Sequence, residues 1–235
     1  MKYWGNLNIQ TTPNNMRIRK RLQLYFGLCK YYGQRKEDKI IAQFFGDFKG
    51  TLLSIGENDG LIYSNVLYFI QRGWKAELIE PAPKAFGRLL RRHFWNGYVH
   101  CHPLAIDNVS ARMPFWESES LVNLGDTGLV SSLYTKLVNQ WSQTKFHKTE
   151  VEVLTFKDFI SQRAWYYKYD LISIDAEGSG LSILKQMDLE KLGCRCLIIE
   201  HEGNLWPYHA IMSASGFRLL ATTEENLIFV RYFES

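Results

Sequence analysis

The stretch Ser54-Ile55-Gly56-Glu57-Asn58-Asp59-Gly60 decides the fold of this chain. The apolar run from Thr51 to Ile55 predicts a buried strand, and the pattern from Leu61 to Arg72 predicts a helix. A strand that breaks into a glycine-containing turn before a helix is typical of α/β sheets that bind nucleotides. Glycine allows a ligand to approach the backbone closely there.

The next strand, predicted over Lys75–Ile79, ends in Glu80-Pro81. A carboxylate at this place can accept hydrogen bonds from the two hydroxyls of a ribose. The first turn lacks both the Gly-Lys-Ser/Thr of a P-loop and the spacing G-x-G-x-x-G, so neither of those motifs is present. The turn and Glu80 together predict a nucleoside held across the carboxyl edge of a parallel sheet.

The rest of the chain alternates strands and helices, which predicts an α/β fold of Rossmann-like type, mostly parallel, with helices on both faces. A C-terminal antiparallel hairpin closes it. The further predicted strands are Tyr98–His102, Tyr169–Ile174, Arg195–Glu200, Phe217–Ala221 and Asn226–Arg231. The further predicted helices are Pro83–Phe94, Gly180–Met187 and Tyr208–Ser215.

Two segments stand outside this alternation. Residues 1–48 are interpreted as an N-terminal helical extension, with helices from Asn14-Asn15 to about Tyr32 and over Glu37–Phe45, and residues 49–235 form the main domain. An insertion at about residues 107–160 holds two extra predicted strands and a loop. The predicted strands are Met113–Glu117 and Glu150–Phe156, and the predicted loop between them is Gly125–Tyr134.

Composition limits the possible classes of protein. With 235 residues, 46% of them hydrophobic, the chain suits one α/β domain. The sequence has no apolar run of about 20 residues, so no membrane span is expected. The N-terminus lacks the apolar segment of a signal peptide, and the four cysteines suit reduced core thiols. The expected location is therefore cytoplasmic.

The net charge of +4 and the pI of about 8.8 leave a nucleic-acid-binding role open. The basic residues gather early in the chain, but a solvated helix face explains such a run better, so nucleic acid is not the favoured partner. The cluster comprises Arg17, Arg19, Lys20, Arg21, Lys30, Arg35 and Lys36.

Acidic residues follow two later strands. Asp175 and Glu177 come at the end of one strand, and Glu200-His201 ends the next. Either Asp175 or His201 could serve as a general base, or Asp175, Glu200 and His201 could bind a divalent metal ion. We expect direct base catalysis, with Asp175, His201 and Glu177 as the catalytic residues.

These motifs, in this order, resemble the FkbM-like methyltransferases. The resemblance rests on Ser54–Gly60, Ile79–Pro81, Ser173–Gly178, Ile199–His201 and Ser215–Phe217. It covers about residues 50–232 and implies a class I methyltransferase sheet that binds S-adenosylmethionine. The implied cofactor-binding residues are Gly56, Asn58, Asp59, Gly60, Glu80, Pro81, Ala105, Ile106 and Asp175. Among them, Ala105 and Ile106 would flank the adenine, and the neighbouring Asp107 could accept a hydrogen bond from its amine.

Two residues depart from the family pattern: the family usually has Asp where this chain has Ser54, and a small residue is common at the position of Glu57. The resemblance implies O-methylation of a hydroxyl on a sugar or natural product. The alternative is a nucleic-acid-binding protein or RNA methyltransferase that uses the basic N-terminal region. A nicotinamide dehydrogenase is disfavoured, because G-x-G-x-x-G is missing. The sequence names neither the acceptor nor the oligomeric state.

Overall fold

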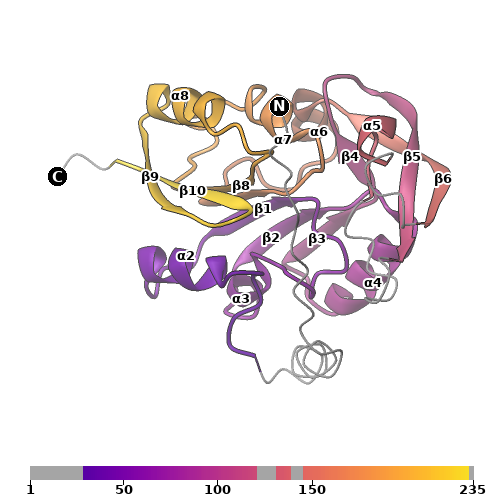
Figure 1. The fold of residues 1–235 in the computed structure, drawn as a ribbon. Helices are drawn as coiled ribbons and strands as arrows, with labels where there is room; N and C mark the ends of the chain where they lie inside the picture. Colours follow the sequence, from indigo (N-terminus) through magenta and orange to yellow (C-terminus); the bar gives the residue numbers. More distant parts are fainter. Residues whose placement is uncertain (1–28, 121–130, 139–144, 233–235) are drawn as a thin grey trace, which may run out of the picture.

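A computed structural model of the chain describes residues 29–120, 131–138 and 145–232. Within these ranges the main sheet has seven strands in the order β3-β2-β1-β7-β8-β10-β9 (Figure 1). Its first five strands run parallel, and β10 is antiparallel to both β8 and β9. The strands are β1 Thr51–Ile55, β2 Lys75–Ile79, β3 Val99–His102, β7 Leu171–Ile174, β8 Cys196–Glu200, β9 Phe217–Thr222 and β10 Asn226–Arg231. The prediction of a mostly parallel sheet with a closing hairpin is confirmed.

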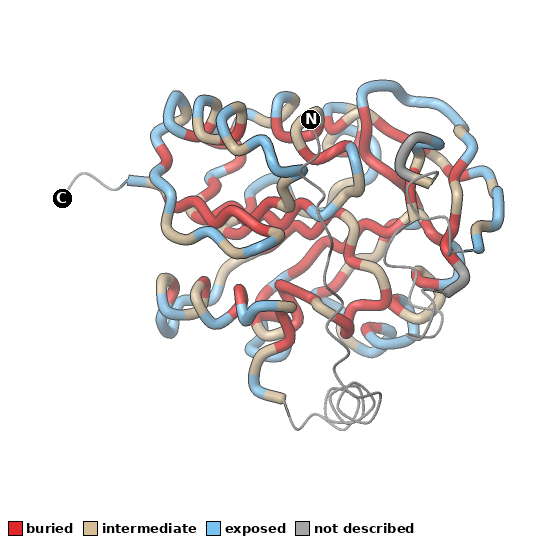
Figure 2. The backbone as a smooth tube through the Cα atoms, viewed as in Figure 1, coloured by how far each residue is buried: buried red, intermediate tan, exposed pale blue. Residues whose placement is uncertain are grey.

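Helices cover both faces of this sheet (Figure 1). Successive strand residues point to opposite faces, so each buried strand contributes side chains to two apolar layers. Leu53 and Ile55 pack with residues of α6, α7 and α8, whereas Leu52 packs with residues of α2, α3 and α4. The helices are α2 Glu37–Phe45, α3 Leu67–Ile70, α4 Pro83–His93, α5 Thr135–Val138, α6 Phe156–Gln162, α7 Gly180–Leu184 and α8 Trp206–Ala214. Figure 2 shows the result, with buried strands between helices whose outer sides are exposed.

The register brings four strand ends to one level. Ile55 of β1 pairs with Ile79 of β2 and with Ile174 of β7, and Ile174 pairs with Ile199 of β8. From β1 the chain first builds outward through β2 and β3, then returns to place β7 on the other side. Ligands of open α/β sheets bind at such a reversal point, outside the carboxyl ends of the strands.

The prediction of a helix over Leu61–Arg72 is wrong for its first half. Within this range only α3, Leu67–Ile70, is α-helical. Local side chains take the backbone N–H groups that would begin the helix. Asp59 Oδ1 accepts from the N–H groups of Leu61 and Ile62, at 2.9 Å each. Tyr63 then has a positive φ of 60°, and Ser64 Oγ accepts from Leu67 N to start α3.

The insertion forms a second sheet of the order β4-β6-β5 in the described residues. Its strands are β4 Leu104–Ile106, β5 Ala111–Ser120 and β6 Lys145–Leu154. The two extra strands are confirmed with wider bounds, but Phe156 begins α6, because Thr155 Oγ1 caps that helix by accepting from Asp158 N. The segment around Ala105 is a strand that pairs in parallel with β6. The predicted loop Gly125–Tyr134 lies mostly outside the described residues.

The described part of the N-terminal extension begins at Cys29. The predicted helix after Asn14-Asn15 lies outside the described residues except for its last turn, and residues 29–32 are not helical. Glu37–Phe45 is helical as predicted. In the described residues, no helix has the length and apolar character needed to cross a membrane.

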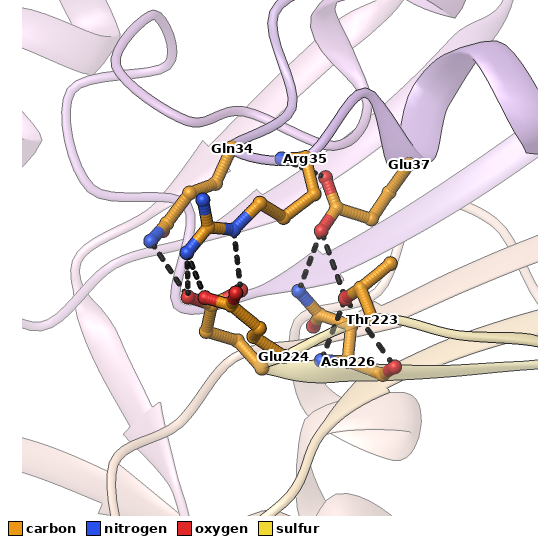
Figure 3. Close-up of polar contacts among 7 residues, drawn as sticks. Gln34, Arg35, Glu37, Thr223, Glu224 and Asn226 are labelled. Atoms are coloured by element: carbon orange, nitrogen blue, oxygen red, sulfur yellow. Dashed lines mark hydrogen bonds and ion pairs between the residues drawn. The ribbon is translucent and has the colours of Figure 1, made fainter. Parts of the chain in front are cut away.

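A polar clamp holds this extension to the turn between β9 and β10 (Figure 3). The carboxylate of Glu37 is fully buried and accepts from Arg35 N, Thr223 Oγ1 and Asn226 Nδ2 at 2.8, 3.1 and 3.3 Å. Arg35 forms ion pairs with Glu224 and Glu225. Because Asn226 pairs with Glu200 across β10 and β8, the clamp lies beside the carboxyl edge of the sheet.

We expect Glu37→Ala to lower the free energy of unfolding by about 2 kcal/mol, because buried donors lose their acceptor. Urea unfolding gives the measurement. Glu224→Ala is the control: its side chain is 70% exposed, and loss of an exposed ion pair should cost less than about 1 kcal/mol. Equal losses for the two variants would contradict an anchoring role for Glu37.

Candidate active site at the carboxyl edge

The aligned strand ends place four candidate residues in a row. Three of them directly follow a strand: Glu80 follows β2, Gly56 follows β1 and Asp175 follows β7. The fourth, Glu200, is the last residue of β8. Gly56 N donates to Ile79 O and Asp175 N donates to Ile55 O, so the backbone holds the row together. The structure therefore brings together residues that lie more than 140 positions apart in the sequence.

Gly56 is the tightest point of this row. Its φ is +84°, and a Cβ built on it would lie 1.8 Å from the carbonyl oxygen of Asp175. Asn58 and Gly60 also have positive φ values, 54° and 70°. The first turn thus curls back over the sheet edge in a shape that depends on glycine at position 56.

Glu80 lies under this turn. Its Oε2 accepts from Asn58 N at 2.8 Å and its Oε1 from Ala82 N at 2.7 Å. Burial is the main cause that raises the pKa of Glu80 to about 7, and the two backbone donors oppose the rise. A carboxylate offers about four acceptor positions, so the two oxygens can still accept from a ribose.

We expect Glu80→Ala to weaken cofactor binding by about 1.5–3 kcal/mol, the range for hydrogen bonds to a charged group. Calorimetric titration with S-adenosylhomocysteine measures this. Glu80→Gln separates the causes, because its amide keeps one acceptor but repels a backbone N–H at the other position. An affinity unchanged in both variants would remove Glu80 from the ribose role.

The other predicted cofactor residues have varied surroundings. Asp59 uses Oδ1 within the turn, as described above, and Pro81 is partly exposed beside Glu80. Ala105 and Ile106 are buried in β4, where Ala105 packs with Ala82 and other apolar side chains. Their contact with adenine stays a prediction.

Asp175 and Glu200 form a carboxyl pair at the reactive part of the edge. Asp175 is exposed at the carboxyl edge of the sheet. Loss of solvation among the surrounding protein atoms is the main cause that raises its pKa to about 6, and a hydrogen bond with Glu200 opposes the rise. Burial, followed by the charges of Asp175 and Glu177, raises the pKa of Glu200 well above its usual range. Glu200 therefore holds the shared proton, and Asp175 is the ionised partner.

Glu177 and His201 flank this pair. Burial, then the charges of Asp175 and Glu202, raises the pKa of Glu177 to about 8, so it is mostly protonated at neutral pH. The His201 ring accepts from Gly203 N through Nδ1, at 3.2 Å. Its Nε2 is buried and has no hydrogen-bond partner among the residues described. This leaves Asp175 as the carboxylate best prepared to accept a proton.

The metal alternative gains no support. Within residues 29–120, 131–138 and 145–232, no group of three or more His, Cys, Asp or Glu side chains has a geometry that could hold a metal ion. Asp175, Glu200 and His201 therefore do not converge as a ligand set in the structure.

The insertion contributes contacts that the sequence did not reveal. Asp107 accepts from Tyr134 Oη at 2.6 Å and from Asn108 N at 2.8 Å, and its contact with adenine stays a prediction. Ser132 Oγ donates to the carbonyl oxygen of Glu177. These partners are 27 and 45 residues apart, so no local pattern could have identified them.

A pocket of about 490 Å³ opens beside this edge, between α7 and the loop from β8 to α8. Most of its lining side chains can form hydrogen bonds. The lining comprises Asn108, Gly178, Leu181, Ser182, Lys185, Gln186, Glu202, Asn204, Pro207 and Tyr208. Its walls thus continue the loops that carry Glu177 and His201.

A sheet of this order, with a glycine turn and an acid at the ends of neighbouring strands, defines a class I methyltransferase that uses S-adenosylmethionine. The profile of the methyltransferase FkbM domain matches residues 54–219. The chain belongs to the FkbM methyltransferase family.

The fold is similar to solved methyltransferase structures at low sequence identity. A ribosomal protein L11 methylase from Lactobacillus delbrueckii subsp. bulgaricus has 10% identity and a TM-score of 0.46, over 85% of this chain and 79% of that one. A methyltransferase from Geobacter sulfurreducens has 11% identity and a TM-score of 0.45, over 90% and 85%. TrmK from M. capricolum, in complex with S-adenosylhomocysteine, has 11% identity and a TM-score of 0.44, over 83% and 65%. No curated protein matches the chain.

Proposed function

We propose that this methyltransferase acts on a hydroxyl group of a sugar or related natural product, which binds in the pocket beside α7. The pocket carries the proposal: its volume of about 490 Å³ lies within the range of small-molecule sites. Its lining offers hydroxyl, amide and carboxylate groups, and the only apolar side chains among the lining residues are Leu181, Pro207 and part of Tyr208. Such a surface suits an acceptor with several hydroxyls.

The residues at the carboxyl edge have separate roles in binding and in proton transfer. S-adenosylmethionine, when bound, supplies a methyl group on a sulfonium centre. The first turn and Glu80 hold the cofactor, and the pocket orients the acceptor oxygen toward the edge. Asp175 accepts the proton of the acceptor hydroxyl as its oxygen gains the methyl group. Proton transfer to a positioned side chain contributes about 10²–10⁴-fold in rate.

Glu200 and Glu177 support Asp175 in different ways. Glu200 keeps its own proton and donates it in the hydrogen bond to Asp175, which holds that carboxylate in place. Glu177, mostly protonated at neutral pH, can donate a hydrogen bond to an acceptor oxygen. Ser132 fixes the backbone of Glu177 and so joins the insertion to this edge.

Two measurements test the proposal. Calorimetry should show binding of S-adenosylmethionine or S-adenosylhomocysteine and none of NAD. Incubation with a radiolabelled methyl donor should then label sugar or natural-product acceptors and leave RNA unlabelled. Micromolar binding of NAD without a signal from the methionine cofactor would overturn the reaction, and label found only in RNA would overturn the acceptor class.

A further inference from the structure

The buried carboxylate of Glu57 joins the two ends of the first turn. Glu57 is 5% exposed. Its Oε2 accepts from Ser54 Oγ at 2.6 Å, and its Oε1 accepts from Ser64 Oγ at 2.6 Å. Ser54 lies in β1, whereas Ser64 lies at the far end of the turn. One side chain therefore spans the segment that contains Gly56, Asn58 and Gly60.

The backbone of Glu57 is held as firmly as its side chain. Its N–H donates to Ile79 O at 3.1 Å, and its carbonyl accepts from Gly60 N at 3.1 Å. Ser64 Oγ also accepts from Leu67 N and so ties the same network to α3. The turn is consequently attached to β2, to β1 and to α3 through a single residue.

The charges around Glu57 explain why both serines are needed. The charged groups that act on its carboxylate most strongly are Asp59 and Asp175, and both are acidic. Burial beside such neighbours disfavours a carboxylate, and hydrogen bonds from Ser54 and Ser64 favour it. The two serine donors therefore offset part of the cost of burying this carboxylate.

We propose that Glu57 is the positioning residue of the cofactor-binding turn, and that Ser54 and Glu57 form a compensating pair. Ser54 Oγ lies 2.6 Å from the Glu57 carboxylate, so an Asp at position 54 would place a carboxylate in the same buried site. Glu57 acts through Gly56, Asn58 and Gly60, whose backbone it shapes. The inference rests on the proposed function only in naming the ligand of the turn.

Four variants test this pair: Glu57→Ala, Glu57→Gln, Ser54→Asp and the double variant Ser54→Asp with Glu57→Ala. Each is titrated with S-adenosylhomocysteine in the full chain, at a temperature where circular dichroism shows the variant folded. Glu57→Ala should bind at least 10-fold more weakly than the parent protein. Ser54→Asp alone should also lose at least 10-fold, because two carboxylates then meet in one buried site.

The conservative and double variants separate positioning from simple destabilisation. Glu57→Gln should stay within 3-fold of the parent, because an amide can accept from one serine and donate to the other. The double variant should likewise recover to within 3-fold. Parent-like affinity in Glu57→Ala would overturn the proposal. A double variant that binds no better than Glu57→Ala would overturn the pairing.

Hydrogen exchange supplies a measurement that needs no ligand. The amides of Gly60 and Leu61 should exchange at least 10-fold faster in Glu57→Ala than in the parent, because the turn loses the side chain that ties its two ends together through Ser54 and Ser64. Unchanged exchange would overturn the positioning role even where S-adenosylhomocysteine does not bind. Absence of binding in the parent protein would instead count against the proposed function. If Glu57→Ala does not fold, Ser54→Ala removes one of the two donors and is read in the same way.

Discussion

Gly56→Ala should lower the free energy of unfolding by about 3 kcal/mol or more and abolish cofactor binding. The new Cβ would lie 1.8 Å from the carbonyl oxygen of Asp175, so β1 and β7 would have to separate at the site. A non-glycine residue held at a φ of +84° adds strain of about 1–3 kcal/mol, and overpacking adds a similar amount. Urea unfolding and titration with S-adenosylhomocysteine measure the two losses.

Gly73→Ala is the matched control for this variant. Gly73 has nearly the same φ, +86°, but the nearest atom to a built Cβ is Lys49 Nζ at 3.9 Å. Its substitution should therefore cost only the conformational term, about 1–2 kcal/mol, and leave cofactor binding unchanged. If Gly56→Ala cost no more than Gly73→Ala, close packing between the first turn and Asp175 would not be the reason for glycine at position 56.

The strands of the sheet were predictable because their signal is local. β1, β2 and β10 have the bounds predicted from their apolar runs, and α2 has the bounds predicted from its helical periodicity. Strand ends in a parallel sheet converge at one edge, so the neighbourhood of Glu80, Gly56 and Asp175 also followed from order alone. The register of the paired strands then aligns these three residues in one row along the edge.

The parts that could not be predicted depend on partners distant in the sequence. The apolar residues after Gly60 suit a helix, yet Asp59 and Ser64 use the N–H groups that would begin one. Ala105 gives no sign that it pairs with Val153, because that pairing requires the insertion to fold back. The same holds for Tyr134, whose hydroxyl meets the carboxylate of Asp107 only in the folded structure.

The clamp of the N-terminal extension bears directly on the chemistry of the edge. The described part of the extension lies beside that edge, where Glu37 contacts Thr223 and Asn226. Loss of solvation is the main cause that raises the pKa of Asp175, and the negative charge of Glu37 in the extension adds to the rise. The extension therefore adjusts the electrostatics of the proposed base as well as stabilising the fold.

Asp175→Asn should lower kcat for the methylated acceptor by at least 100-fold, within the range of about 10²–10⁴ for loss of a general base. The amide keeps the size of the side chain and cannot take the acceptor proton. Affinity for S-adenosylhomocysteine should change by only a few-fold, because Gly56 and Glu80 still hold the cofactor. Single-turnover rates and calorimetry, with exposed Glu190→Gln as the control, give both quantities.

His201→Ala and a chelator distinguish Asp175 from the other candidates. If Asp175 is the base, His201→Ala should keep most of the turnover, and EDTA should leave the rate of the parent protein unchanged. Loss of activity with EDTA, restored by a divalent ion, would favour the metal route for which the described residues form no ligand group. Near-normal turnover in both Asp175→Asn and His201→Ala, with cofactor bound, would contradict a reactive edge at these strands. The acceptor would then approach from the insertion, where Tyr134 and Ser132 already contact Asp107 and Glu177.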